Sequence, residues 1–182
     1  AWLNHNNMRA ANTLDVLAEE NGVEFIRHFL IDFSGSLGSG IRELKPAWQG
    51  NEPIMGENLL RNLAGLGVIS DPWMRARYTK IPAVGRFEAA TFDPEAWVTN
   101  QPLAPFVNRL PDDTFWAAAK VMAFTDEDIR ALVSTGQYSD PAAVDWIARC
   151  LMERRDRIGR TYFDRVLPLD GFRVEANELK FD

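Results

Sequence analysis

Two runs of strand-forming residues, 12–19 and 23–31, flank the dipeptide Asn21-Gly22, and this feature constrains the fold more than any other. Asn-Gly is the strongest local signal for a two-residue type I′ turn, because both residues adopt a positive φ at low cost. The turn sets the register, with Glu20 opposite Val23. Side chains alternate between faces, so one face is apolar and contains Leu14, Val16, Ala18, Phe25 and Phe29.

The same register brings polar side chains together at the open end of the hairpin. Asn12 pairs with Ile31, and Asp32 follows directly, so we expect the amide and the carboxylate to lie side by side. Such a pair can hold a divalent cation beside a phosphate group. On the other face, Asp15 lies opposite His28, which predicts an ion pair.

The order of these residues resembles the catalytic segment of protein-kinase-like folds, in which an Asn ends a polar loop and a hairpin leads to Asp-Phe-Gly. Here the chain runs from His5-Asn6-Asn7-Met8-Arg9 through Asn12 to Asp32-Phe33-Ser34. The segment is also similar to a group of uncharacterised bacterial proteins, which look related to the atypical kinases typified by spore-coat and toxin–antitoxin kinases. The specific motif covers residues 4–40.

The resemblance implies a phosphotransferase-like site with Mg²⁺ and ATP as cofactors; the alternative is a chain that binds neither. The candidate site residues are Asn7 and Arg9 for catalysis, Ser34 and Gly35 for the cofactor, and Asn12 and Asp32 for the metal. Asn7 departs from the pattern, because these folds carry an acidic residue there and an amide cannot accept a proton from the acceptor.

Nothing before the motif supplies the Gly-rich phosphate lid or the strand lysine of a kinase-like fold. The chain starts at Ala1, without Met, and we expect an N-terminal region of the protein to be missing from it. Enzymatic activity therefore stays open. The alternative is a non-catalytic structural or accessory subunit, with a protein partner or the missing region covering residues 41–110. A third reading is a binding module for a sugar or peptide.

The segment 34–40, Ser-Gly-Ser-Leu-Gly-Ser-Gly, has two interpretations. Its backbone N–H groups could form an anion-binding nest beside Asp32. Alternatively, it is a flexible connector that leaves a strand, which is what short Gly/Ser-rich stretches usually are. We favour the connector.

Composition limits the other classes of function. A chain of 182 residues with 46% hydrophobic content can bury a core, as one domain or one lobe. A net charge of −6 argues against binding to nucleic acid or to an anionic membrane. Cys150 is the only cysteine, so no internal disulfide is possible. No apolar run of 18 residues predicts a membrane span. A soluble protein, cytoplasmic or exported, fits this composition.

Beyond the hairpin segment 1–40, residues 41–110 predict an irregular wrap with one helix over 57–64, and residues 111–182 predict a helical part. Its helices begin at Asp112 or Asp113, at the capping box of Thr125 with Asp128, and at Asp140, and the last runs to Phe163. Residues 172–176 predict an edge strand that 179–181 extend. The fold class is α+β, like the C-terminal lobe of a kinase-like fold.

Arg154 interrupts the apolar stripe of the longest predicted helix. Its guanidinium could bind a buried carboxylate or phosphate, or it could form a structural ion pair or reach out to water, which we favour. The basic run around it predicts a solvated face with pairs such as Glu153–Arg157. His5 and His28, the only histidines, form a weak metal signal.

Overall fold

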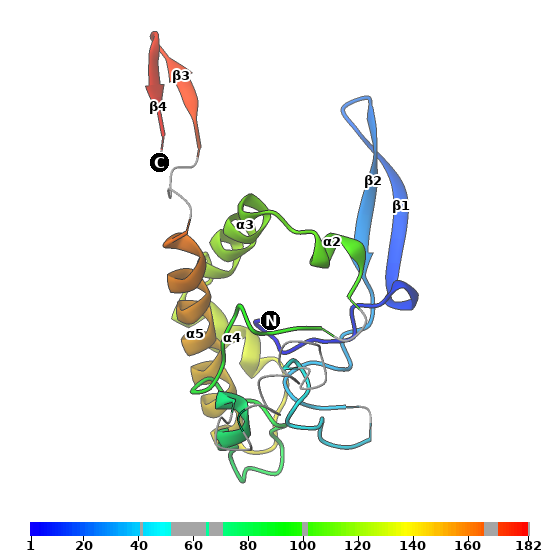
Figure 1. Ribbon diagram of the computed structural model, residues 1–182, viewed down its shortest axis with the longest axis vertical. Coiled ribbons are helices and arrows are strands. Elements are labelled where there is room, and N and C mark those ends of the chain that lie inside the picture. The colour runs from blue at the N-terminus through cyan, green and yellow to red at the C-terminus, as the bar shows by residue number, and fades with distance from the viewer. Residues whose placement is uncertain (41, 52–64, 66–70, 100–101, 166–170, 182) are drawn as a thin grey trace.

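The structure is a computed structural model that describes residues 1–40, 42–51, 65, 71–99, 102–165 and 171–181. Within these ranges it contains four α-helices and two antiparallel two-stranded sheets, which confirms the α+β class. Figure 1 shows both hairpins projecting from the same end of a body that is built around the long helix α5.

The first hairpin has the predicted register. Strands β1 (Thr13–Glu20) and β2 (Val23–Leu30) pair from Glu20–Val23 to Thr13–Leu30. Asn21 and Gly22 have φ of 55° and 78°, as a type I′ turn requires. On the second face, Asp15 Oδ1 lies 2.7 Å from His28 Nδ1, so the predicted contact is confirmed.

Much of the apolar surface of this hairpin is exposed. Leu14 and Phe29, on the predicted apolar face, are 50% and 43% exposed. On the opposite face, Leu17 and Ile26 are 65% and 51% exposed. The strands rise away from the body in Figure 1, so the described part of the chain leaves both faces largely uncovered.

The described residues of the middle of the chain are mostly irregular, with a 3₁₀ turn at Pro72–Arg75 and a single helical turn, α2 (Ala104–Val107). The helix expected over 57–64 lies outside the described residues. Irregular backbone does not mean exposure here, because Phe87 is completely buried. Val84, Phe87 and Ala89 belong to the main core cluster together with residues of α4 and α5.

Three helices form the C-terminal part: α3 (Pro111–Met122), α4 (Asp126–Ser134) and α5 (Pro141–Phe163). The capping box at α4 is confirmed, since Thr125 Oγ1 accepts the N–H of Asp128 at 3.1 Å. Asp140 also caps α5 as predicted, by accepting the N–H of Ala142 at 2.9 Å.

The predicted N-cap of α3, Asp112 or Asp113, is wrong by two or three residues, because the N-cap residue is Leu110. The helix begins at Pro111, where proline is favoured because its missing N–H needs no partner in the first turn. Asp113 lies in the first turn of the helix, and its carboxylate accepts a hydrogen bond from the N–H of Leu110 at 2.8 Å.

The chain end is a second hairpin, not one extended strand. Strands β3 (Arg173–Glu175) and β4 (Glu178–Lys180) pair antiparallel. Ala176 and Asn177 both have positive φ, 48° and 69°, so the chain reverses between the segments that we predicted to continue each other. Among the described helices, none is long and apolar enough to cross a membrane.

Candidate functional site

The base of the first hairpin brings together the three central residues of the kinase-like motif. Asn7 Nδ2 donates to Asp32 Oδ2 at 2.7 Å, and Asn12 Nδ2 donates to the backbone carbonyl of Asn7 at 2.9 Å. Asp32 therefore bonds to the side chain of Asn7, while Asn12 bonds to the backbone of Asn7. The hairpin register explains the arrangement: the N–H of Ile31 donates to Asn12 O at 3.1 Å, so the chain presents Asp32 one residue beyond the last pair.

The Asp32 carboxylate is ionised at neutral pH. Its Oδ1 accepts two hydrogen bonds from Ser34, one from the backbone N–H at 3.0 Å and one from the hydroxyl at 2.6 Å. These bonds hold the pKa of Asp32 below its usual 3.8, and the charges of His5 and Arg9 lower this pKa further. Arg9 itself is exposed, and the predicted cofactor residue Ser34 therefore serves here as a partner of the carboxylate.

Lys45 is a member of this site that sequence reasoning missed. Its buried ammonium donates to Asn6 Oδ1 and to the carbonyl oxygen of Gly35. Burial lowers the pKa of Lys45, while the charge of Asp32 acts in the opposite direction. A single lysine in a stretch rich in Pro and Gly carries no recognisable pattern, so only the folded loop reveals that it ties residue 6 to residue 35.

His5 is, after Lys45, a second buried side chain of the site that can carry a positive charge. Its ring stacks on Phe33 with centroids 4.9 Å apart, and its Nδ1 lies 3.4 Å from the hydroxyl of Ser36. Burial lowers the pKa of His5, and the charge of Lys45 lowers it further, so the ring releases its proton more readily than a free imidazole does. His28 is exposed on the hairpin and bound to Asp15, so the two histidines do not share a metal site.

Most backbone N–H groups of the Gly-rich segment 34–40 form hydrogen bonds within the protein. The N–H groups of Ser36, Leu37, Ser39 and Gly40 donate to the carbonyls of Phe33, Leu3, Ser36 and Glu43. They are therefore unavailable to an anion, and the nest interpretation fails at these positions.

The connector interpretation needs a correction as well, because the segment is packed and not flexible. Gly38 has a φ of +70°, and a Cβ at this position would lie 2.2 Å from the carbonyl oxygen of Arg86. Backbone–backbone contact of this kind admits only glycine. Gly35, the other predicted cofactor residue, is buried against the Lys45 side chain.

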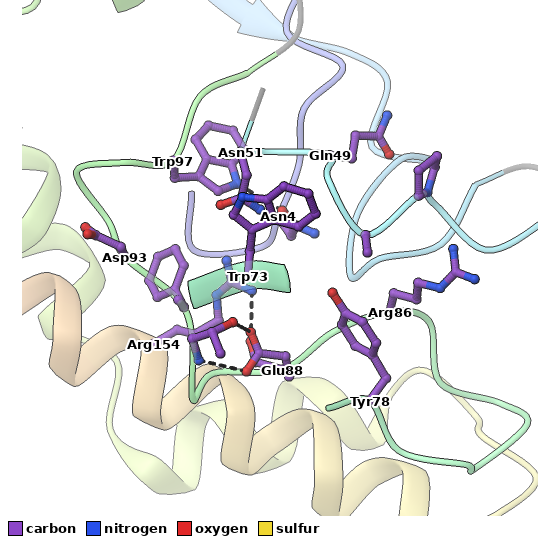
Figure 2. A pocket seen from close by; sticks show the side chains of 14 residues that line it. Asn4, Gln49, Asn51, Trp73, Tyr78, Arg86, Glu88, Asp93, Trp97 and Arg154 are labelled. Atoms are coloured by element: carbon purple, nitrogen blue, oxygen red, sulfur yellow. Dashed lines mark hydrogen bonds between the residues drawn. The ribbon is translucent and has the colours of Figure 1, made fainter. Parts of the chain in front are cut away.

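A separate cavity lies between the middle of the chain and α5. Figure 2 shows Trp73, Tyr78 and Trp97 around it, with the Arg154 side chain reaching up from the helix toward Glu88. Its volume is about 30 Å³, which suits about two water molecules and is far too small for a nucleotide. None of the six predicted site residues lines it.

Arg154 is a structural residue of that cavity wall. Its guanidinium donates to the backbone carbonyls of Glu88 at 3.1 Å and Ala1 at 3.0 Å, and lies over the rings of Phe87 and Phe92. Burial lowers its pKa to about 9, so the group stays charged at neutral pH. The two forms that we favoured, an ion pair and a side chain that reaches water, are wrong: within the described residues the buried guanidinium bonds to backbone carbonyls instead.

The solvated face predicted for the neighbouring arginines is wrong at Arg155 and Arg157, although Arg160 is exposed. Arg155 pairs with Asp126 at 2.8 Å and joins α5 to α4. Arg157 donates to the backbone carbonyl of Ala90 at 3.1 Å and joins α5 to the irregular segment. Helical spacing predicts the i,i+4 contacts but does not show which loops pack on the helix.

No described group of three or more His, Cys, Asp and Glu side chains could hold a metal by itself. A cation at Asp32 would thus depend on amide oxygens, water and a bound ligand. Neither a protein-family model, nor a curated protein, nor a solved structure matches this chain.

Proposed function

We propose that the chain is a kinase-like lobe that binds Mg²⁺ and nucleotide at the base of the β1–β2 hairpin and has lost phosphoryl transfer. One observation carries the proposal: the contact between Asn7 Nδ2 and Asp32 Oδ2 at 2.7 Å, with Asn12 bonded to the backbone of Asn7. The three residues that the kinase-like motif assigns to one site are adjacent in space although up to 25 residues separate them.

The residues at this position fit a magnesium ion bound together with a phosphate. Mg²⁺ prefers oxygen ligands, and in nucleotide sites it takes one or two carboxylates and completes its shell with phosphate and water. Asp32 supplies one ionised carboxylate, and the side chains of Asn7 and Asn12, which the hydrogen bonds hold in the same cluster, are the amide candidates. The ion would supply charge neutralisation for the phosphate groups, and the exposed Arg9 would add a further positive charge.

Asn7 is the reason for proposing binding without transfer. A general base needs a group that takes up a proton, and a carboxamide does not do so near neutral pH. Here the Asn7 amide also donates to Asp32, so it stabilises the ionised carboxylate. An aspartate at this position would instead place two carboxylates in contact and raise one pKa.

A thermal-shift titration with Mg²⁺ and ATP tests the binding. A ligand at a hundredfold excess over its dissociation constant stabilises a protein by about 2.7 kcal/mol, and this shift should disappear in Asp32→Ala. Asp15→Ala is the matched control, because it removes an exposed carboxylate of the same hairpin that lies away from the site. A shift that is equal in both variants, or that needs no Mg²⁺, would contradict the proposal.

Asn7→Asp tests the reason for the loss of transfer. We expect release of the γ-phosphate from ATP by Asn7→Asp, and none from the unaltered chain. If the variant binds Mg²⁺–ATP and stays inactive, then the missing carboxylate is not the cause, and groups beyond this motif are needed for transfer.

The second candidate function is a non-catalytic accessory subunit. It is favoured by the exposed apolar residues on both faces of the β1–β2 hairpin, because a two-stranded hairpin is rarely stable without cover. A subunit of this kind would bind through the hairpin and would show no nucleotide-dependent shift.

A further inference from the structure

We propose that two copies of this chain associate through the outer edge of β2, with the two β2 strands antiparallel about a twofold axis at Ile26. The result is a four-stranded sheet in the order β1-β2-β2-β1. This inference concerns a surface remote from Asp32 and holds whether or not the chain binds nucleotide.

The structure shows which backbone groups of β2 point outward. The N–H of Ile31 donates to Asn12 O, so the odd-numbered residues on this side of the hairpin bond to β1. In an antiparallel pair these positions alternate, and the even-numbered residues Glu24, Ile26 and His28 therefore direct their N–H and C=O groups away from β1. Within the described chain no strand pairs with that edge.

The side chains along β2 are complementary to themselves in this register. With the axis at Ile26, that residue faces its own copy, and Glu24 faces His28 of the second copy. On the other face, Phe25 lies opposite Arg27 of the second copy, and an arginine already lies over this ring within one chain, at 5.2 Å from the centroid. Each of these cross-strand pairs is then apolar, a carboxylate that faces an imidazole, or cation–π.

The single hairpin contains an unfavourable pair that the second copy would relieve. Glu19 lies directly opposite Glu24, and like charges in this position destabilise a sheet. Both side chains are exposed, as is the whole edge around Glu24. His28 of the second copy would place a protonatable group beside this acidic pair, on the same face of the sheet.

Other twofold pairings of the same hairpin are worse. An axis at Arg27 places that arginine opposite its own copy, and an axis at Phe25 leaves Glu24 opposite Ile26. Pairing through the outer edge of β1 places Asp15 opposite itself, opposite Glu19, or opposite Leu17. The acidic residues of β1 thus protect that edge, in the way that charged side chains usually protect free strands.

Pairing through β2 would also join the two predicted apolar faces. Each copy contributes the exposed apolar side chains of one face, which are Leu14, Val16, Val23 and Phe29. Figure 1 shows the hairpin clear of α5 and of the second hairpin, with α2 beside its lower part. Glu24, Ile26 and His28 along its edge strand are exposed.

Disulfide trapping tests the register. In a hydrogen-bonded antiparallel pair the Cα atoms are about 5.5 Å apart, which suits a disulfide, so Ile26→Cys should crosslink two copies under mild oxidation. The native Cys150 is buried, and burial raises the pKa of its thiol to about 12, so it does not interfere. A non-reducing gel measures the yield.

Leu17→Cys is the matched control, because Leu17 is the partner of Ile26 on β1 and is more exposed to solvent than Ile26, 65% against 51%. Across the proposed sheet the two Leu17 positions are three strand spacings apart, about 14 Å, which no disulfide spans. Equal crosslinking of both variants, or no crosslinking of Ile26→Cys, would overturn the proposal.

Sedimentation velocity over a range of protein concentrations tests the charge pairing. We expect a reversible dimer that Glu24→Arg weakens about tenfold, because it replaces the carboxylate that faces the His28 imidazole, in both symmetry-related pairs, with a guanidinium that cannot accept a hydrogen bond. Glu19→Arg relieves the same acidic pair from β1 and should change the dimer much less. The double variant Glu24→Arg with His28→Glu should recover association. A monomer at every concentration, or a dimer that is indifferent to Glu24→Arg, would overturn the proposal.

Discussion

The β1–β2 hairpin and the body around α5 differ in how their structure is specified. In the hairpin, an Asn-Gly turn and alternating side chains determine every pair from Glu20–Val23 to Thr13–Leu30, yet most of these side chains remain exposed. In the body, Phe87 lies in irregular backbone and is completely buried. Regular local structure is therefore a poor guide to burial in this protein, because the core is formed by what packs on α5.

The two regions also use arginine differently. Arg27 on the hairpin pairs with Glu20 at the exposed tip, where an ion pair adds little stability. Arg154 is buried and bonds two backbone carbonyls that come from residues 1 and 88. A buried guanidinium of this kind joins three distant segments, and we expect the body to depend on it.

The largest contrast is expected between two phenylalanines. Phe87→Ala should lower the free energy of unfolding by about 4 kcal/mol, because it removes a fully buried ring from the core. Phe29→Ala, in the half-exposed hairpin, should cost under about 1 kcal/mol. Urea unfolding followed by tryptophan fluorescence measures both. Equal losses would mean that the hairpin is part of the core.

A comparison of two glycines with positive φ, Gly38 and Gly22, distinguishes the stability cost of left-handed backbone strain from the cost of steric crowding. Gly38→Ala should destabilise by about 3 kcal/mol, since its new Cβ would meet the backbone of Arg86. At Gly22 no atom lies within 4 Å of a Cβ, so Gly22→Ala should cost only about 1 kcal/mol of left-handed strain. Thermal unfolding gives the two values, and a Gly22→Ala loss as large as that of Gly38→Ala would contradict this explanation.

Arg154→Met should lower stability by about 2.5 kcal/mol, because it leaves the carbonyls of Glu88 and Ala1 buried without a donor. Arg160→Met is the matched control, since Arg160 is exposed on the same helix, and its effect should be within about 0.5 kcal/mol. Urea midpoints compare the two. If Arg154→Met proves neutral, the guanidinium does not link the three segments.

The smallest effect concerns the cap of α4 and depends on pH. Thr125→Ala should cost about 1 kcal/mol at neutral pH, because it removes the hydroxyl side of the capping box. Hydrogen bonds from Thr125 hold the pKa of Asp128 below its usual 3.8. The unfolded chain therefore binds this proton more readily, and the contribution of Asp128 is complete above about pH 4 and lost as the pH falls through the lowered pKa.

Urea unfolding measured over a series of pH values checks the direction of this pH dependence. The difference in urea midpoint between the unaltered chain and Thr125→Ala should shrink below pH 4 and stay constant from pH 5 to pH 7. A gap that grows on acidification would mean that the Asp128 carboxylate does not take part in the cap.

Prediction from sequence succeeded where contacts are local. The hairpin register, the capping box at Thr125 and the start of α5 at Pro141 all depend on residues within a few positions of each other. It failed where the partner is distant: Lys45 bonds to Asn6 across 39 positions, and no pattern in either segment indicates the other. The reversal at Ala176-Asn177 was missed because Ala is unfavourable at a positive φ, so that Asn177 was the one turn-forming residue of the pair.

The candidate site divides in the same way. The hairpin register predicted that Asn12 and Asp32 would lie side by side, but Asp32 bonds to Asn7, and Asn12 bonds to the backbone of Asn7. The sequence could not decide that Asn7, and not Asn12, would contact Asp32, because that choice depends on how residues 4–9 cross beneath the hairpin.

By itself, the sequence of this protein determined the turns, the caps and the strand register, since these follow from φ preferences and side-chain hydrogen bonds over a few residues. Only the tertiary structure decided which polar groups are buried, among them Arg154, Lys45 and His5. Their burial depends on the backbone carbonyls, amides and rings that distant segments bring to them, and the free energy of those contacts exists only after the chain has folded.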